Sequence, residues 1–479
     1  MDAFRQHRTW KRARRLGLSQ LACLGRHTVA SLICASGRQA DDWSADYRLF
    51  ARDKWDADDL FVPVVRGALH MLPDNAPLVT ALDDTRLPKS GRKIPGVGFG
   101  RDPMSPPFHV NLVPGQRFVQ LSAMVPAGEA PSPARGVPVR FHHQPPVRKP
   151  KASADEEVKK AYREKCRRNN LSTCGRDLIG NLRDEMDRRH DAKGRELVVA
   201  GDGSYTNKTV LRTLPDRTTF IGRIRKDAKL HHPPRADQQP QVGSKRRYGD
   251  VAHTPDELRK DESVPWKPVE AYASGKVHTF RIKEMKPILW RKAGVDLPVR
   301  IVVIAPVGYR LRKGGKLLYR QPAYLLCTDL DMPIAELLQY YLWRWDIEVN
   351  HRDEKQLVGV GQAQVWSRQS TDRQPALAVA SYAYLLLAAL RVYGINERGP
   401  VIPIPKWQKA NTLSRISTQK LLQKLRSEIW ANAIERLERN ANRRLEGDSD
   451  DFVIDPAPNT KSQESEFPLQ SVALFARAG

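Results

Sequence analysis

Four residues in the last third of the chain combine the side chains used in phosphate chemistry with a regular spacing. Tyr341, Arg344, Glu348 and Lys355 stand within the run YLWRWDIEVNHRDEK. On a continuous helix of about 100° per residue they lie at roughly 0°, −60°, −20° and −40°, so they share a stripe about 60° wide. Solvated helices scatter their charges and core helices exclude them. The stripe therefore predicts a face that holds one carboxylate among cations and is directed at a charged partner.

The helix that carries this stripe is expected over residues 331–357. Pro333 in the first turn is a start signal and Asp331 is a candidate N-cap. By the same angular count Asp346 and Asp353 point more than about 100° away from the stripe. These two acids are therefore assigned to a different face of the helix.

Two apolar runs elsewhere in the chain end abruptly in acids. The run LVTAL is followed by Asp83 and Asp84, and the run ELVVA is followed by Asp202 between two glycines. Each motif taken alone is typical of a turn after a strand. Together with Glu348 they form a set of hard oxygen ligands, which Mg²⁺ prefers and which two-metal phosphoryl transfer requires. The pattern therefore predicts a metal site built from two strand ends and one helix.

The first acid of this set is ambiguous. Asp83 and Asp84 are adjacent, and consecutive side chains of a strand point to opposite faces, so only one should face the metals. The residue pattern by itself leaves both open.

These motifs resemble those of DDE transposases of the bacterial insertion-sequence type, in the group whose last catalytic helix carries Y-(2)-R-(3)-E-(6)-K. The segments ALDDTRLPKSGRK and LVVAGDGSYTNK resemble the surroundings of the first two acids. The segment TTFIGRIRKDA resembles the basic strand that follows the second Asp. The resemblance covers roughly residues 78–395. Relatives place an Asp, a variable residue and then Thr or Ser at the first site, which favours Asp83 over Asp84.

The resemblance implies a reaction, a cofactor and partners. Asp83, Asp202 and Glu348 would hold two Mg²⁺ ions, for which Mn²⁺ can substitute. Water would attack the phosphodiester at the end of the element, and the freed 3′-OH would then attack target DNA. A homodimer on paired ends is expected. The side chains expected to contact DNA are Tyr341, Arg344, Lys355, Arg223 and Arg225.

The expected fold class is α/β, with a ribonuclease-H-like catalytic core interrupted by a strand-rich insertion. Residues 76–227 and 326–395 would form the core, and residues 228–325 the insertion. Residues 1–75 would form a small helical DNA-binding domain. A basic helical region (396–445) and a disordered acidic tail (446–479) would follow.

More specific expectations concern individual segments of the chain. Residues 1–16 are rich in Arg and are expected to form either a mobile arm along phosphates or a solvated tail. A helix-turn-helix in the helical domain could bring Arg26, His27 or Arg38 to DNA. The proline-rich stretch 126–150 is expected to be a loop, and residues 228–262 a loop or the edge of the insertion.

Composition supports a polyanionic partner. The chain of 479 residues has a formal net charge of +26 and a pI of about 10.0, which suits nucleic acid better than a membrane or a small-molecule substrate. The five cysteines show no metal-ligand spacing, so reduced thiols and a cytoplasmic, nucleoid-associated location are expected. The apolar segment 375–390 is shorter than a membrane span of about 20 residues and is expected to be a buried helix.

Two alternatives remain beside the transposase. A DNA-binding regulator, or an element-derived protein that has lost catalysis, would show the same charge and helical N-terminus but would have no use for the acid trio. A structure-specific nuclease on the same fold would cut strands without joining them.

Overall fold

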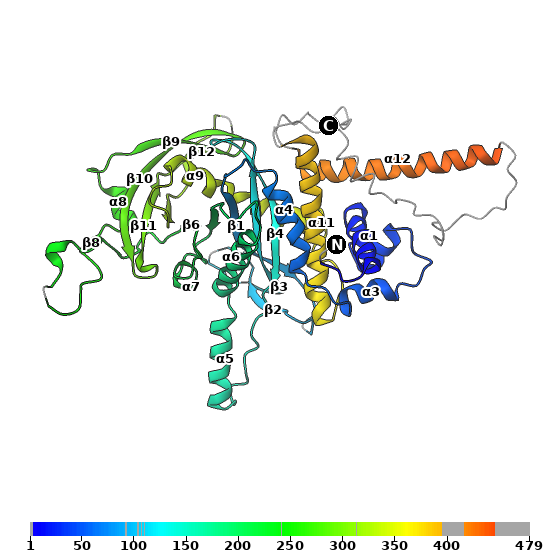
Figure 1. The fold of residues 1–479 in the computed structure, drawn as a ribbon, viewed down its shortest axis with the longest axis horizontal. Coiled ribbons are helices and arrows are strands. Elements are labelled where there is room, and N and C mark those ends of the chain that lie inside the picture. Colours follow the sequence, from blue (N-terminus) through cyan, green and yellow to red (C-terminus); the bar gives the residue numbers. More distant parts are fainter. Residues whose placement is uncertain are drawn as a thin grey trace.

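The computed structural model describes residues 3–394 and 416–445, apart from residues 92, 103, 104, 107, 110, 241 and 313. The expected acidic tail (446–479) and the first part of the expected basic region (396–415) lie outside the described residues. The molecule is elongated, with strands 267–327 toward one end and the N-terminal helices toward the other (Figure 1).

One mixed sheet forms the centre of the molecule. Its strands lie in the order β4-β3-β1-β5-β6, in which β1, β5 and β6 are parallel and β3 and β4 run antiparallel to their neighbours. These strands are β1 (Leu78–Pro88), β3 (Leu112–Pro126), β4 (Ala134–His143), β5 (Leu197–Gly201) and β6 (Thr218–Arg223). The apolar runs found in the sequence thus become central, buried strands.

The sequence pattern predicted that strand β1 ends at its acids. This prediction is wrong. The strand continues to Pro88 because β3 pairs with it along its whole second half, with Asp83 opposite Gln120 and Asp84 opposite Val119. On the other side β5 pairs only with Leu78–Leu82 and ends at Gly201. The two acids therefore lie within a strand, at the point where its parallel neighbour ends.

The expectation of a loop over residues 126–150 is wrong for residues 134–143. Strand β4 occupies Ala134–His143 and is buried against β3. Its Pro138 lacks an N–H donor, yet β4 is paired on one side only and the pairing shifts register beside this residue, so the donor is not needed. A short strand, β2 (Gly98–Arg101), also pairs with β3.

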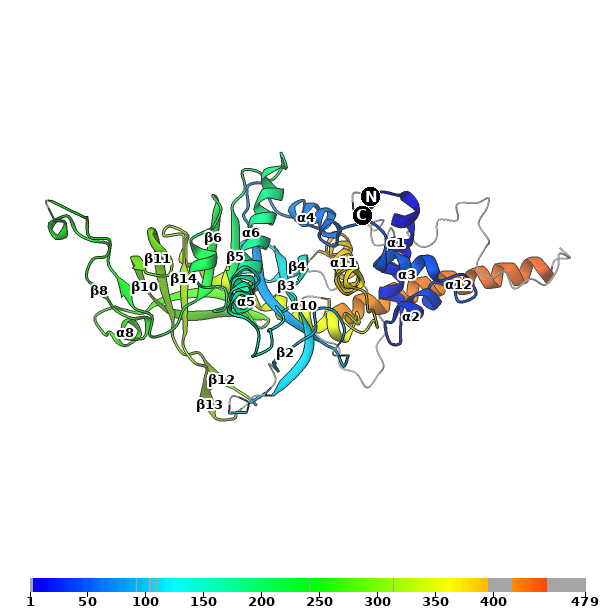
Figure 2. The same cartoon turned by 90° about the horizontal axis from the view of Figure 1, so that it is seen from below.

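The strands of the expected insertion extend the same sheet. β14 (Ala323–Cys327) pairs with β6, and the sheet continues through β11 (Gly294–Ile304) and β10 (Lys276–Trp290). β9 (Lys267–Ala273), β7 (Leu230–His231) and β8 (Val251–Ala252) pair along this end. β12 (Gly308–Arg310) and β13 (Leu317–Tyr319) form a separate projecting hairpin (Figure 2).

The stretch 228–262 is more ordered than a loop. Besides β7 and β8 it contains η2 (Ala236–Gln238) and α8 (Pro255–Lys260). Helix α8 begins with a capping box, in which Thr254 and Glu257 satisfy each other's backbone N–H groups.

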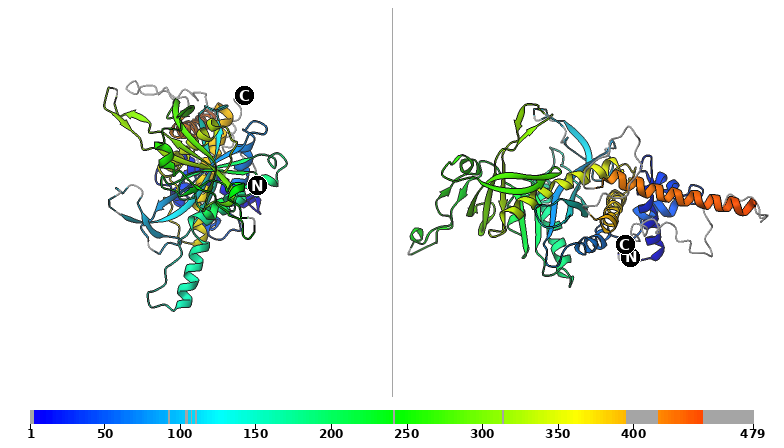
Figure 3. Two further views of the ribbon diagram at one scale, coloured as in Figure 1. Left: turned by 90° about the vertical axis from the view of Figure 1, so that its left-hand side faces the viewer. Right: turned by 90° about the horizontal axis from the view of Figure 1, so that it is seen from above.

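Helices cover both faces of the central strands. α9 (Ile334–Trp343) and α10 (Trp345–Gln356) pack on the face that carries Val79, Ala81 and Val198. α6 (Leu171–Asp187) packs on the opposite face through Leu178, Leu182 and Met186. α5 (Glu156–Arg168) projects away from the body (Figures 1 and 3), and α7 (Lys208–Leu211) packs beside α6.

The N-terminal helices surround a long, buried helix. α11 (Arg368–Tyr393) confirms the buried helix expected over the apolar segment 375–390. It is long and apolar enough to cross a membrane by composition, but 67% of its most apolar window is buried inside the protein. Against it pack α1 (His7–Ala22), α3 (Ser44–Ala51), η1 (Asp58–Phe61) and α4 (Val62–Leu69), and α2 (Val29–Ala35) packs on α1 and α3.

One expectation for the N-terminal region is wrong, and another loses one of its three candidate residues. Residues 7–16 form no arm or tail, because they belong to α1, where Arg12 and Arg15 pair with the buried Asp46. His27 does not reach outward, because it is buried and its backbone N–H donates to the side chain of Gln362 at 3.0 Å.

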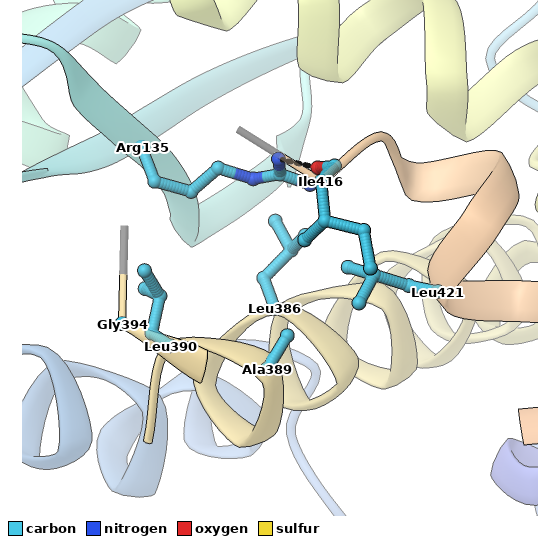
Figure 4. A pocket seen from close by; sticks show the side chains of 7 residues that line it. All are labelled: Arg135, Leu386, Ala389, Leu390, Gly394, Ile416 and Leu421. Carbon is cyan, nitrogen blue, oxygen red and sulfur yellow. Dashed lines mark hydrogen bonds between the residues drawn. The ribbon is translucent and has the colours of Figure 1, made fainter. Parts of the chain in front are cut away.

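Helix α12 (Thr418–Leu445) extends beyond the N-terminal helices (Figure 3). Its start is fixed where β4 meets α11: the Arg135 guanidinium donates to the carbonyl of Ile416 and to the Thr418 hydroxyl. Leu386, Leu390 and Leu421 line a narrow gap of about 10 Å³ there (Figure 4). Because such a gap holds a single water at most, the junction is a packing contact.

Candidate active site

The predicted helix over residues 331–357 is two helices that meet at Arg344. The N–H of Arg344 donates to Tyr341 O and the N–H of Ile347 donates to Arg344 O, which are tighter, three-residue contacts. The expected cap is also wrong: Asp331 is exposed, and α9 starts after Pro333 without a side-chain cap. The break places Arg344 at the junction, directly before the turn that carries Glu348.

Parallel pairing brings the first two acids together. Leu82 is paired with Gly201, so the residues that follow, Asp83 within β1 and Asp202 after β5, lie at the same level of neighbouring strands. The carboxylate of Asp202 is held by Ser204, whose backbone N–H donates to Oδ1 at 2.8 Å and whose hydroxyl donates to Oδ2 at 3.3 Å. The parallel pairing of β1 and β5 therefore sets the spacing of these two acids.

Arg344 joins the sheet acids to the helix acid. Its Nη1 lies 3.7 Å from Asp83 Oδ2, and its Nη2 lies 3.2 Å from Glu348 Oε1. The Arg344 side chain is only 12% exposed, so this bridge is largely shielded from water. One guanidinium thus spans residues 83 and 348, which are separated by most of the chain.

Asp83 and Asp84 face opposite sides of the sheet. Asp83 continues the row of Val79 and Ala81, which packs under α9 and α10, and it is the acid that reaches Arg344. Asp84 pairs instead with Arg117 on β3 at 3.4 Å. The alternation expected of a strand is therefore observed, and it places Asp83 on the same side as Glu348.

Burial and mutual repulsion disfavour the ionised forms of the acids at this site. Burial, reinforced by the charges of Asp202 and Asp84 and opposed by Arg344, raises the pKa of Asp83 to about 7. Burial also raises the pKa of Asp84, against the effect of Arg117, and that of Glu348, against the effect of Arg344. Asp202 contributes to all three shifts, which shows that the four carboxyls share one electrostatic site.

The helix stripe surrounds these acids as the spacing indicated. The Arg344 guanidinium lies over the ring of Tyr341 at 5.8 Å. Burial raises the pKa of the Tyr341 hydroxyl, with Arg344 and Arg223 opposing this shift. Burial lowers the pKa of Lys355, while the charges of Glu354, Asp83 and Asp84 raise it. Tyr341, Arg344, Glu348 and Lys355 thus all lie beside the sheet acids.

Of the two arginines expected to contact DNA from the strand after Asp202, only Arg223 lies at this site. Its charge acts on Tyr341. Arg225 is exposed and forms a two-pronged ion pair with Asp227 at 2.8 and 2.9 Å. No interaction between Arg225 and the acids is found among the described residues.

The opposite face of α10 fixes the helix to the sheet. Asp346 accepts the backbone N–H of Gly136 on β4, and Asn350 Nδ2 donates to Ser122 Oγ on β3 at 3.1 Å. Trp343 Nε1 donates to Ser132 O at 2.7 Å. Asp346 thus has the separate, structural face that its angular position predicted, and its bond helps to orient Glu348.

Two residues of the site were not predicted from the sequence. Arg117, on β3, is the ion-pair partner of Asp84. Tyr205 is fully buried beneath the acids, and its pKa is raised by burial and by Asp84, Asp83 and Asp202. The motif GDGSY contained a signal for Tyr205, because an aromatic residue directly after a polar turn is typical of a side chain that returns to the core.

The donor set fits a hard divalent cation. Asp83, Asp202 and Glu348 offer only carboxylate oxygens. Burial raises the pKa of Asp83 and of Glu348, and a cation bound among these crowded carboxylates would compensate their negative charge. In the described part of the chain, no three His, Cys, Asp or Glu side chains converge closely enough to hold one metal ion. Since Arg344 lies between Asp83 and Glu348, joint coordination by these residues would require its guanidinium to move aside.

Comparison with known proteins agrees with this site. The family described as DDE superfamily endonuclease matches residues 1–293, a stretch that includes Asp83, Asp84 and Asp202 and ends before Glu348. A search of the curated proteins found no match. Divalent metals are the usual cofactors of such endonucleases and DNA is their substrate. Because the match spans more than half of the chain, this protein belongs to the DDE superfamily endonucleases, enzymes that act on DNA.

Proposed function

We propose that this endonuclease is a DNA transposase of the insertion-sequence type, which cuts the ends of its element and joins them to target DNA. The observation that carries the proposal is the bridge of Arg344 between Asp83 and Glu348, next to Asp202. It joins Asp83, one of the two acids of the matched region, to a third acid on the helical segment whose residues keep the Y-(2)-R-(3)-E-(6)-K spacing.

The sheet supports a ribonuclease-H-like core. In the order β4-β3-β1-β5-β6, three antiparallel strands precede two that are parallel to β1, and the first two acids belong to β1 and to the end of β5. A helical N-terminal domain, a strand-rich insertion over 228–325 and a basic C-terminal region remain part of the proposal. So does a homodimer that holds two element ends.

Each residue has a proposed role. Asp83, Asp202 and Glu348 would hold two Mg²⁺ ions, which would supply charge neutralisation and activation of the attacking oxygen. Tyr341, Arg344 and Lys355 would bind the phosphates beside the cut. Arg344 suits this role because its planar fork, which already makes two contacts to carboxylates, can engage two phosphate oxygens.

The test compares cleavage, joining and binding in two variants. Glu348→Gln should abolish Mg²⁺-dependent cleavage of a duplex that carries the element end while binding of that duplex is largely retained. Asp331→Asn, which removes a fully exposed carboxylate before α9, is the matched control and should cleave normally. Cleavage by Glu348→Gln would refute the assignment. Cleavage by the native chain without joining would favour a nuclease over a transposase.

A further inference from the structure

A basic hollow lies next to the loop that carries Asp202. It has a volume of about 610 Å³ and is formed by the end of α5, the start of α6 and helix α7. Its charged lining residues are Arg167, Arg168, Arg176, Lys208 and Arg212, together with the acid Asp177. None of these residues belongs to the acid cluster or to the stripe on α9 and α10.

Within the described part of the chain, three of the five cations have no acidic partner. Arg168 pairs with Glu164 and Arg176 pairs with Asp177. The guanidinium of Arg212 donates to a backbone carbonyl, Arg291 O, at 2.7 Å, so its charge is not neutralised. Among the described residues, no carboxylate lies within ion-pair distance of Arg167, Lys208 or Arg212. The hollow therefore carries an excess of positive charge on a concave surface.

Short hydrogen bonds tie the hollow to the active site. Asn207 Nδ2, one residue before Lys208, donates to Ser172 Oγ on α6 and to Ser204 O, both at 2.8 Å. Ser204 in turn holds the Asp202 carboxylate through its backbone N–H. The fold thus holds the backbone that carries Lys208 next to the Asp202 loop.

A structural role at the end of α5 accounts for some of these cations. Arg167 and Arg168 lie in the last turn of α5, where cations interact favourably with the helix dipole. The dipole of α5 does not explain Lys208 and Arg212, which come from a separate segment and face the same hollow. Two segments that bring unpaired cations to one concavity indicate a ligand with several negative charges.

We infer that the hollow binds the sugar-phosphate backbone of the DNA on the Asp202 side of the cut. This inference rests on the proposed function and extends it, because it assigns a course to the duplex beyond the reacting phosphate. Contacts of this kind position the DNA and contribute affinity without reading its sequence. Arg167 and Lys208 are the central residues, since neither has a competing partner within the described part of the chain.

The test measures duplex binding as a function of salt concentration, in EDTA so that no strand is cut. Each phosphate contact that is lost should lower the slope of log K against log salt by about 0.9. The double variant R167Q/K208Q should therefore lower the slope by about 1.8, and with it the affinity at low salt by at least about tenfold. The change should be the same for duplexes of different sequence.

A matched control removes the same charge from the far end of α6. R188Q/K193Q neutralises two exposed cations beyond the other end of this helix of about 25 Å and should leave the slope unchanged. Equal slopes in R167Q/K208Q and the native chain, or an equal change in both double variants, would overturn the inference.

Two further outcomes distinguish DNA-backbone binding in the hollow from small-anion binding and from the proposed reaction. Inorganic phosphate, added at an ionic strength matched with chloride, should not displace the duplex more than chloride does. Displacement by phosphate together with an unchanged slope would indicate a small-anion site and overturn the inference. Because the measurement needs no catalysis, failure of the Glu348→Gln test would refute the proposed reaction and leave the slope result to be judged separately.

Discussion

The guanidinium of Arg344 lies 3.7 Å from the carboxylate of Asp83, although the two residues are far apart in the chain. Asp83 is on a central strand and Arg344 is at the junction of two helices on the covering layer. The contact orients the acid and the helix toward each other. It also keeps a cation within the carboxylate cluster, so that the charges of Asp83 and Glu348 are compensated.

Arg344→Ala should impair cleavage more strongly than binding. Hydrogen bonds to charged groups contribute roughly 1.5–3 kcal/mol, so the single-turnover rate of end cleavage should fall by roughly 10- to 150-fold. Arg352→Ala is the control, because Arg352 is an exposed arginine on α10 that forms an ion pair with its neighbour Asp353. A native cleavage rate in Arg344→Ala would contradict a role for the bridge.

Asp83→Asn and Asp84→Asn should differ. Asp83 faces Glu348, so its loss should remove several kcal/mol of charge stabilisation and reduce Mg²⁺-dependent nicking by more than about 100-fold. Asp84 makes a partly exposed ion pair with Arg117, for which about 1 kcal/mol or less is expected, so its loss should cost less than about tenfold. The reverse order of the two rates would assign the ligand role to Asp84.

Lys355→Ala should reduce the salt dependence of binding to the element end. A single phosphate contact contributes about 0.9 to the slope of log K against log salt, and this is the expected decrease. Lys424→Ala, on α12 and already paired with Glu428, serves as the comparison and should not change the slope. An unaltered slope in Lys355→Ala would argue that this lysine only balances the charges of Asp83 and Asp84.

Glu354 should make stability depend on pH. Complete burial raises the pKa of this carboxyl from 4.5 to about 8. Between these values the unfolded chain releases the proton while the folded chain keeps it, so folding stability should fall as the pH rises from about 4.5 to 8. Glu354→Gln should flatten this decline and raise Tm by a few degrees at pH 8. Thermal unfolding at several pH values measures it, and parallel curves for both proteins would contradict it.

Gly359→Ala should weaken the contact between the end of α10 and the N-terminal helices. Gly359 has a φ of +71°, and a Cβ there would collide with the ring of His27. Strain and overpacking should together cost about 1–3 kcal/mol of unfolding free energy. Gly180→Ala, in α6 with nothing within 4 Å of the new methyl, should instead stabilise the protein by about 0.5–1 kcal/mol. Denaturant unfolding of both variants gives the comparison.

Local patterns predicted much of this molecule. The apolar runs before Asp83 and Asp202 identified two central strands, and helical spacing placed Tyr341, Arg344, Glu348 and Lys355 beside one another. These features depend on neighbouring residues, because strand alternation and helical rotation are properties of a short segment. The charge of +26 likewise indicated a polyanionic partner without any knowledge of the fold.

Other features required the tertiary structure, because their causes lie far away in the chain. β4 is a strand despite its proline because β3 supplies its partner, and β1 continues beyond Leu82 for the same reason. Asp83 is distinguished from Asp84 by the helices that cover its face of the sheet. The basic hollow exists only where α5, α6 and α7 meet. Local sequence patterns thus predicted which side chains could take part in the chemistry. Long-range pairing and packing decided which of them face one another, since the partners of a strand or a side chain are not encoded by its neighbours.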